Sequence, residues 1–411
     1  MCINYKFIKK LLAFFLVITF VFPICSLASD VYVWSSDDEI SAVSANVSDS
    51  SNVSTNLNLD CGSAILIEQN SGKVLYEQNM HEKLRPASVT KVMTILLIME
   101  ALDNGTITLD TPIPCSENAN SMGGSQIWLD TRETLTVHEM LKAICVVSAN
   151  DCTVAMAEYL AGSEEGFVMQ MNNKAKELGM NDTTFKNCHG IDEDGHVTSA
   201  YDIALMSREL LTKHPKITEY TTIWMDTLRD GKSQLVNTNK LIRNYKGATG
   251  LKTGSTSVAL FNLSASATRD GLSLIAVIMK APSTKVRFAE AQKLLDYGFS
   301  NYSYSEFGKT GDVVKSCVVN KGISSNVDAI LENSCGALVK KGDAKNLTQD
   351  VVIEDFVNAP VVKGQKLGEV RYSINGEIVG SSNIVAACDI NKISLWNMAN
   401  FLYNSWYRLI R

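Results

Sequence analysis

Two groups of strand-like runs enclose a long helical region, and this order constrains the fold more than any other feature of the sequence. The first group is a predicted hairpin at residues 64–67 and 74–76. The second group contains three predicted strands, at 250–254, 261–267 and 272–279. Because both groups must pair to bury their apolar faces, we expect an α+β domain. One antiparallel sheet should join both ends of the domain, flanked by a helical cluster.

The helical region begins after Arg85-Pro86-Ala87, where apolar residues keep a helical period until Asn104-Gly105 stops it. Thr136-Val137-His138-Glu139 has capping-box spacing and predicts a second helix start. Four more helices are expected: one from Asn150-Asp151 to Ala161-Gly162, and others at 164–179, 199–213 and 286–297. The last of these closes the first domain, which we place at residues 60–302.

Strand-like runs return at 313–319, 351–356 and 367–374, and they predict a small all-β domain over 305–388. Residues 391–411 differ, because Ile, Leu, Met, Phe and Trp form a broad apolar stripe among Asn, Ser and Arg. This pattern predicts an amphipathic helix that lies in a membrane interface. A helix that docks on its own protein is the alternative.

Residues 1–28 have the pattern of a secretory signal peptide. Three lysines precede an apolar run at 11–21, and small residues for cleavage follow at Ser26-Leu27-Ala28. A single membrane helix is the alternative. Residues 29–59, rich in Ser, Asn, Asp and Val, predict a linker. We therefore expect an exported protein at the outer face of the cytoplasmic membrane or in the cell wall.

Charge and cysteine usage limit the partners. The net charge of the 411-residue chain is -6, whereas a nucleic-acid binder needs a basic face, so we expect no nucleic-acid partner. Of the ten cysteines, Cys2 and Cys25 lie in the predicted signal, and the other eight are scattered without CxxC spacing. Buried thiols are therefore a better interpretation than a disulfide framework or a metal site.

Ser88-Val89-Thr90-Lys91 carries the strongest chemical signal. Residues three apart share a helix face, so the Lys91 amine can reach the Ser88 hydroxyl. A serine needs a base to become a nucleophile, and Lys91 can serve once burial and nearby positive charge lower its pKa. The start of a helix also favours negative charge that develops at Ser88. Alone, the pattern is weak, since a cap and a solvated lysine produce it too.

Two further triplets complete the pattern. Ser148-Ala149-Asn150 lies in the break between two predicted helices, where a hydroxyl and an amide can relay a proton and hold a substrate amide; plain helix capping is the alternative. Lys252-Thr253-Gly254 lies on a predicted strand, where a cation and a hydroxyl can bind a peptide carboxylate. Ser44-Ala45-Asn46 and Lys309-Thr310-Gly311 repeat these triplets outside such contexts, the latter in a turn where we expect no strand.

The ordered set of three motifs resembles that of penicillin-binding proteins and class A β-lactamases. More specifically, from residue 60 onward the chain resembles the low-molecular-weight penicillin-binding proteins of the serine-type D-alanyl-D-alanine carboxypeptidase family. The matching segments are Arg85-Pro86-Ala87-Ser88-Val89-Thr90-Lys91, Cys188-His189-Gly190-Ile191-Asp192, Gly195-His196, Tyr201-Asp202 and Gly250-Leu251-Lys252-Thr253-Gly254.

This resemblance implies an enzyme without metal or cofactor that removes the terminal D-alanine from peptidoglycan stem peptides ending in D-Ala-D-Ala, and that β-lactams acylate. It also implies a β-rich second domain and a C-terminal membrane anchor. The implied roles are Ser88 as nucleophile, Lys91 as base, Ser148 as proton relay, Asn150 as substrate anchor, Lys252, Thr253 and Gly254 as substrate site, and the Ser88 and Ser255 N–H groups as oxyanion hole. The segment 255–260 departs from the family, which more often has an acidic residue and a glycine there.

Three alternatives remain open at this level. A β-lactamase needs a Glu-x-x-Leu-Asn type loop for deacylation, and residues 160–180 contain none. A zinc peptidase would use the cluster of His189, Asp192, Asp194 and His196, although this cluster has no helical His-x-x-x-His. A pseudoenzyme that only binds peptidoglycan would not need the intact motif residues.

Overall fold

The computed structural model describes residues 57–396, 398–399, 403 and 406. A five-stranded antiparallel sheet has the strand order β2-β1-β9-β8-β7. The strands are β1 (Ser63–Glu68), β2 (Val74–Gln78), β7 (Ala248–Thr256), β8 (Leu260–Arg269) and β9 (Leu272–Ala281). Because β1 pairs with β9, the sheet joins both ends of the segment, which confirms the predicted topology.

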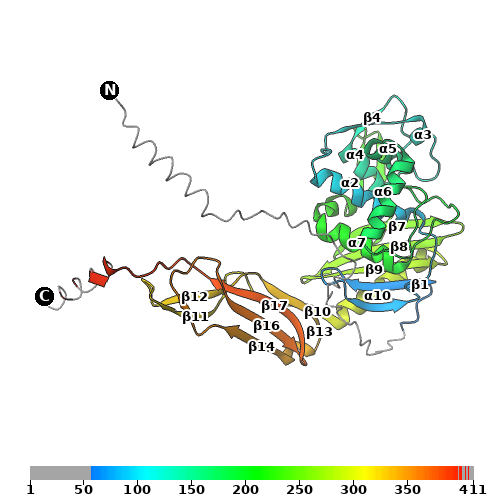
Figure 1. The fold of residues 1–411 in the computed structure, drawn as a ribbon. Coiled ribbons are helices and arrows are strands. Elements are labelled where there is room, and N and C mark those ends of the chain that lie inside the picture. The colour runs from blue at the N-terminus through cyan, green and yellow to red at the C-terminus, as the bar shows by residue number, and fades with distance from the viewer. Residues whose placement is uncertain (1–56, 397, 400–402, 404–405, 407–411) are drawn as a thin grey trace, which may run out of the picture. The chain divides into compact units, whose positions relative to one another are not determined.

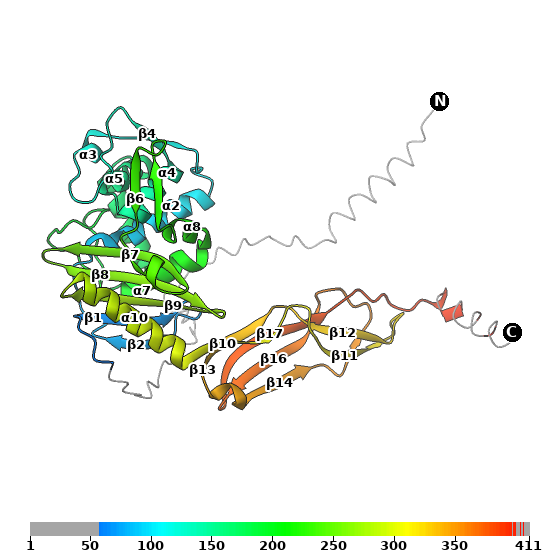
Figure 2. The ribbon, with the colours of Figure 1, turned by 180° about the vertical axis from the view of Figure 1, so that it is seen from behind.

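Both faces of this sheet are covered. Ala64 and Leu66 of β1 pack in the cluster that contains α10 (Thr284–Asn301). Ile65 and Ile67 point the other way, into the larger cluster formed with the helices. Figure 1 shows these helices above the sheet, and Figure 2 shows the same arrangement from behind. Burial of both faces explains why the strand is apolar without alternation.

The main helices lie close to the predicted ranges. They are α2 (Lys91–Asp103), α4 (Val137–Val147), α5 (Asn150–Ala161), α6 (Glu164–Glu177) and α7 (Ala200–Lys213). The Thr136 capping box is present, with Glu139 bonded back to the Thr136 backbone. One difference matters for the site, because a 3-10 turn, η1 (Ala87–Thr90), precedes α2 and contains Ser88.

Several short elements were not predicted, because segments of three or four residues have no measurable period. They are β3 (Pro112–Pro114), α3 (Glu117–Asn120), β4 (Thr134–Thr136), η2 (Pro215–Ile217), α8 (Thr218–Thr221), β5 (Met225–Leu228), β6 (Ser233–Val236) and α9 (Leu241–Asn244). Two of them matter below: β5 and β6 form a hairpin whose turn contains Arg229.

The C-terminal part is a separate β-rich domain with the strand order β14-β16-β17-β12-β11-β15 and an additional β10-β13 pair. Its core contains Val327, Ala329, Val370 and Ile384. The strands are β10 (Tyr302–Gly308), β11 (Val313–Asn320), β12 (Asn326–Leu331), β13 (Cys335–Lys340), β14 (Leu347–Ile353), β15 (Phe356–Asn358), β16 (Lys366–Ile374) and β17 (Glu377–Ala386), with the turn η3 (Asp343–Asn346).

Two predictions for this domain were wrong in detail. The expected strand at 351–356 is divided, because the chain leaves β14 at Glu354 and Asp355 and then enters β15, which pairs in parallel with β11. Lys309-Thr310-Gly311 does lie in a turn, but strands β10 and β11 flank it. The strands at 302–308, 326–331, 335–340 and 377–386 were not predicted.

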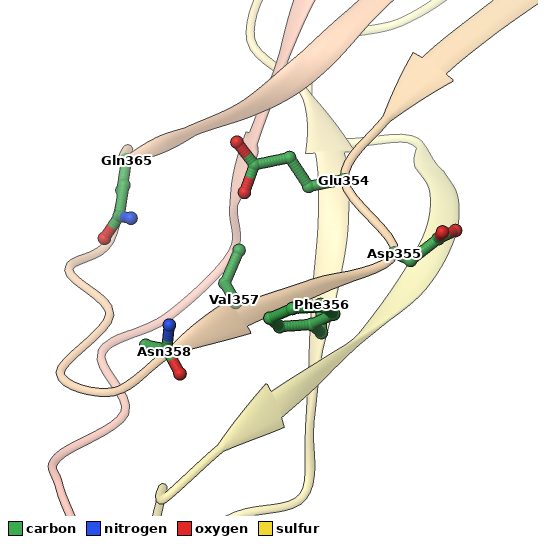
Figure 3. A pocket seen from close by; sticks show the side chains of 6 residues that line it. All are labelled: Glu354, Asp355, Phe356, Val357, Asn358 and Gln365. Carbon is green, nitrogen blue, oxygen red and sulfur yellow. The ribbon is translucent and has the colours of Figure 1, made fainter.

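A hollow of about 370 Å³ lies where β14 and β15 separate (Figure 3). Its lining residues are Glu354, Asp355, Phe356, Val357, Asn358 and Gln365. None of the residues predicted from the motifs lines it. The chemistry of the motifs therefore belongs to the first domain and not to this hollow.

The two ends of the chain lie largely outside the description. The predicted signal at 1–28 and most of the linker at 29–59 fall on residues that are not described, whereas Leu57 and Leu59 already pack against the sheet core. No helix among the described residues is long and apolar enough to cross a membrane. The eight cysteines beyond residue 56 are unpaired, and six of them are buried.

Candidate active site

Lys91 is the centre of the site. Its Nζ donates to Ser88 Oγ at 3.1 Å, to Asn150 Oδ1 at 2.6 Å and to the His189 carbonyl oxygen at 2.7 Å. Three elements therefore meet at one amine: η1 with the start of α2, the start of α5, and the loop before α7. Asn150 Oδ1 and the His189 carbonyl can only accept, so they take two hydrogens of the amine, and the remaining position of Nζ faces Ser88 Oγ.

Burial changes the acidity of this amine. Lys91 is fully buried, and burial lowers its pKa well below the usual 10.5, with a further decrease from the charge of Lys252. Once it loses a proton, the amine keeps its two hydrogens for Asn150 Oδ1 and the His189 carbonyl, and its lone pair can accept the proton of the Ser88 hydroxyl. The geometry thus provides a nucleophile and a base in contact.

Ser148 and Asn150 form the second edge of the site. Ser148 ends α4 in a left-handed conformation, with φ of 65°, and its buried hydroxyl has no hydrogen-bond partner among the described residues. Asn150 begins α5, and its Nδ2 donates to the Gly123 carbonyl at 2.7 Å. The Asn150 amide is therefore oriented by Lys91 on one side and by the 121–130 loop on the other.

Strand β7 runs directly beside the Ser88 turn. A Cβ atom added to Gly254 would lie 2.8 Å from the Pro86 oxygen and 2.9 Å from the Ser88 nitrogen. Only glycine permits this approach, which brings the end of β7 and the backbone of Ser255 next to the Ser88 N–H. Gly190 packs as closely on the other side, since its added Cβ would lie 2.0 Å from the Ala87 oxygen.

Lys252 and Thr253 lie on the same strand. Lys252 is buried, its Nζ donates to the Thr253 carbonyl at 3.0 Å, and burial lowers its pKa to about 7, to which the charge of Arg287 contributes. Thr253 Oγ1 donates to Thr238 Oγ1 at 2.8 Å. A cation and a hydroxyl thus stand together on β7, the arrangement that a carboxylate ligand requires.

Sequence reasoning missed two residues here. Arg287 of α10 is buried and donates from Nη1 to the carbonyls of Gly254 and Asn262, both at 3.1 Å. Thr238, after β6, orients Thr253. A signal for Arg287 did exist, because it shares the buried face of α10 with Ala291, Leu294 and Leu295.

The loop from 187 to 196 packs against α2 and does not gather its polar residues at one point. Thr90 Oγ1 contacts His196 Nε2 at 2.9 Å, and Asp194 forms an ion pair with Arg85. Burial lowers the pKa of His189 to about 3, so the imidazole is neutral at pH 7 and its 3.4 Å contact with Glu164 is not an ion pair. The described residues contain no group of three His, Cys, Asp or Glu side chains arranged for a metal ion.

Comparison with known proteins identifies the family. A family model described as D-alanyl-D-alanine carboxypeptidase matches residues 49–283, more than half of the 411-residue chain. The chain belongs to the D-alanyl-D-alanine carboxypeptidase family. It is therefore a serine-type peptidase, a hydrolase of peptidoglycan metabolism. A second model, the C-terminal domain of penicillin-binding protein 5, matches residues 302–392.

Individual proteins of similar sequence carry the name of the same family. D-alanyl-D-alanine carboxypeptidase DacF of Bacillus subtilis is 44% identical over 348 residues, which cover 84% of this chain and 89% of that protein. DacC of Escherichia coli is 30% identical over 361 residues, 85% of this chain and 90% of that protein.

Solved structures are also similar. The peptidoglycan synthesis regulatory factor PBP3 of Streptococcus pneumoniae has a TM-score of 0.70 and 29% identity, and the match covers 81% of this chain and 100% of that one. Penicillin-binding protein 5 of Haemophilus influenzae has a TM-score of 0.67 and 29% identity, with 81% and 98% covered. Penicillin-binding protein D2 of Listeria monocytogenes, solved with ampicillin bound, has a TM-score of 0.55 and 32% identity, with 59% and 99% covered.

Proposed function

We propose that the enzyme removes the terminal D-alanine of stem peptides through an acyl-enzyme on Ser88. Lys91 acts as general base, Ser148 relays a proton, and Asn150 holds the substrate amide. Lys252 and Thr253 bind the terminal carboxylate beside Gly254. The N–H groups of Ser88 and Ser255 stabilise the oxyanion that develops on the scissile carbonyl.

The proposed reaction has two steps. In the first, Ser88 Oγ bonds to the carbonyl carbon of the penultimate D-alanine while its proton moves to Lys91 Nζ. The carbon–nitrogen bond then breaks, and the leaving amine of the terminal D-alanine takes a proton from Lys91 through Ser148 Oγ. In the second step, water adds to the ester, releases the shortened peptide and returns the proton to Ser88.

The contact between Lys91 Nζ and Ser88 Oγ carries the proposal. Its length is 3.1 Å, and the buried amine has a pKa well below 10.5. A merely structural lysine would be charged and paired with a carboxylate, whereas the groups in contact with Lys91 Nζ are a hydroxyl, an amide and a backbone carbonyl, none of them charged. This environment favours the neutral base.

Intact-mass measurement after exposure to penicillin tests the nucleophile. Opening of the β-lactam ring by Ser88 adds the mass of the whole antibiotic, and Ser88→Ala should abolish the adduct. Ser257→Ala is the matched control, because Ser257 is exposed just beyond β7 and has no assigned role. An adduct that persists in Ser88→Ala, or peptide cleavage that a chelator abolishes, would overturn the assignment.

β-Lactams are proposed as covalent inhibitors. Support comes from the ampicillin-bound Listeria relative and from the lack of a Glu-x-x-Leu-Asn type loop at 160–180. Without a carboxylate placed to activate water, the penicilloyl ester should be long-lived. Recovery of free enzyme within seconds after removal of penicillin would contradict this.

We further propose an exported enzyme that contains a signal peptide at 1–28, a linker at 29–59, a catalytic domain at 60–302, a β-rich domain at 305–388 and an amphipathic anchor helix at 391–411. The described part of the last segment supports a membrane surface as partner. Leu395 and Trp396 are 86% and 74% exposed, and Trp406 is 63% exposed. Large apolar side chains that gather in one exposed segment favour an interface with lipid.

Truncation tests the anchor. Removal of residues 395–411 keeps the backbone bridge between Gly322 and Lys392, so the β-rich domain remains intact. The truncated enzyme should remain in the supernatant when membranes are sedimented and should still form the penicillin adduct. Val318 and Val352, exposed apolar residues of the β-rich domain, provide the control when both are replaced by Ser. Unchanged membrane retention after truncation would contradict the anchor.

A further inference from the structure

We propose that Trp128 forms a distal subsite that stacks on a sugar ring of the glycan strand carrying the stem peptide. This inference rests on the proposed function and extends it, because it names what the enzyme binds beyond the peptide. No motif of the sequence includes Trp128. It lies in the loop that connects α3 to β4.

Trp128 is turned outward by a strained backbone. Its side chain is 75% exposed, and its φ of 55° lies in the left-handed region, which bulky residues rarely occupy. The N–H groups of Ile127 and Leu129, on either side of it, both donate to Oδ2 of the buried Asp151 at 3.0 Å. One carboxylate thus holds both neighbours inward and leaves the indole at the tip.

The same loop is attached to the active site. Asn150, next to Asp151, donates from its backbone to the Ser125 carbonyl and from its side chain to the Gly123 carbonyl, both at 2.7 Å. Asn150 Oδ1 in turn accepts from Lys91 Nζ. The indole therefore has a fixed position relative to the site, as a binding platform requires.

The β5–β6 hairpin holds the loop from the other side. Arg229 at its turn donates to the carbonyls of Ile127 and Trp128, at 2.9 and 3.4 Å, and is paired with Glu133. From this turn, the four residues of β6 extend about 13 Å, and the two residues after them add at most about 7 Å. Thr238 follows two residues later and contacts Thr253 of the proposed carboxylate site.

This spacing agrees with the length of a stem peptide. A peptide of about five residues reaches at most about 17 Å. If its C-terminal carboxylate lies at Thr253, its other end comes to within about one residue's length of the hairpin turn beside Trp128. That end of a stem peptide is attached to a sugar of the glycan strand. The distal ligand is therefore a sugar and not another amino acid of the stem.

The groups around the Trp128 indole also favour a sugar as the ligand. When the Gln126 amide is oriented to satisfy both of its groups, its oxygen accepts from Trp128 Nε1 at 3.3 Å. The indole N–H is thus occupied, and only the faces of the ring remain for a ligand. Ile127 and Leu129 are buried, and polar Ser125 and Asp130 flank them. A single flat aromatic among polar groups suits a sugar ring, whereas a protein or lipid partner requires a contiguous apolar patch.

Two substrates test the proposal: a peptide ending in D-Ala-D-Ala, and the same peptide attached to a disaccharide of the glycan. The ratio of kcat/KM for the sugar-bearing over the sugar-free peptide should fall about fivefold to tenfold in Trp128→Ala. Trp128→Phe should retain most of the ratio. Tyr159→Ala is the matched control, because Tyr159 is an aromatic of α5 that is 45% exposed. An unchanged ratio in Trp128→Ala would overturn the subsite.

A binding measurement keeps this test independent of catalysis. Ser88→Ala is titrated calorimetrically with a peptide-free tetrasaccharide of the glycan, with and without the Trp128→Ala change. Weaker binding in the double variant supports the subsite, and equal binding in both variants, or no binding to Ser88→Ala, overturns it. Failure of the acyl-enzyme proposal would instead appear as a missing penicillin adduct in the unmodified enzyme.

Discussion

Lys91 Nζ donates to Asn150 Oδ1 at 2.6 Å, and both side chains are buried. Asn150 is uncharged, so it orients the amine without stabilising the ammonium form as a carboxylate would. The neighbouring acid, Asp151, accepts from the backbone N–H groups of Ile127 and Leu129, and its charge offsets only part of the lowering of the Lys91 pKa. The choice of an amide at position 150 therefore keeps the pKa of Lys91 low.

Asn150→Asp should raise the pKa of Lys91, because a carboxylate in contact favours the charged amine by about 1–3 pH units. We expect the rate of penicillin acylation at pH 7 to fall at least about tenfold and to recover as the pH is raised. Stopped-flow acylation measured across pH provides the readout. Asn244→Asp on the exposed side of α9 is the control. A fall that is equal at every pH would mean that Asn150 acts only through substrate contacts.

The pH dependence of substrate binding should report Lys252. Burial lowers its pKa to about 7, so the fraction of ammonium decreases as the pH rises through 7. A carboxylate ligand stabilises the ammonium and moves the transition upward in the complex. We expect KM for a peptide with a free carboxylate to rise above pH 7, whereas KM for the corresponding peptide amide stays flat. Parallel pH profiles for the two peptides would exclude Lys252 as the carboxylate partner.

The sequence was sufficient for the elements with a clear period and for the motifs that they position. Helices α4 to α7 and the pairing of β1 with β9 followed from apolar periodicity, capping residues and the order of the elements. It was not sufficient in the β-rich domain, where exposed and buried positions alternate irregularly. The division at Glu354–Asp355 depends on the pairing of β15 with β11, a contact between distant segments.

The active site, too, could be predicted from the sequence only in part. The motif residues meet as the spacing predicted, but the groups that orient them come from segments without motifs. Thr238, Arg287 and the His189 carbonyl each contact a motif residue from a different element. A backbone carbonyl has no signature in sequence, and a single threonine or arginine gains significance only from its neighbours in space.

Gly254→Ala should block the site while leaving the fold intact. The new methyl would lie 2.8 to 2.9 Å from backbone atoms of Pro86, Val89 and Ser88, which cannot rotate away as a side chain can. Displacement of β7 from the Ser88 turn should lower the penicillin acylation rate at least about 100-fold. Gly311→Ala in the β-rich domain is the control for backbone strain alone, because its φ is +88° and nothing lies within 4 Å of its added Cβ. If the acylation rate of Gly254→Ala is within threefold of the rate of the unmodified enzyme, β7 can move away from the Ser88 turn without loss of acylation.

Lys252→Met should stabilise the enzyme while it abolishes carboxylate binding. The unfolded lysine holds its proton up to pH 10.5, whereas the folded one loses it near pH 7, so in this window the unfolded state binds more protons and stability rises with pH. The cost of burying Lys252 is therefore largest at and below pH 7 and vanishes above 10.5. Methionine fills the same space without a charge and leaves only the Thr253 carbonyl without its 3.0 Å donor.

We expect the free energy of unfolding, measured with urea, to increase by roughly 1–2 kcal/mol at pH 6 and by less at pH 9. Lys309→Met, on the exposed turn of the repeated triplet, should change stability little at either pH. A loss of stability in Lys252→Met at pH 6 would show that the ammonium is compensated in the folded enzyme and that its pKa is not lowered.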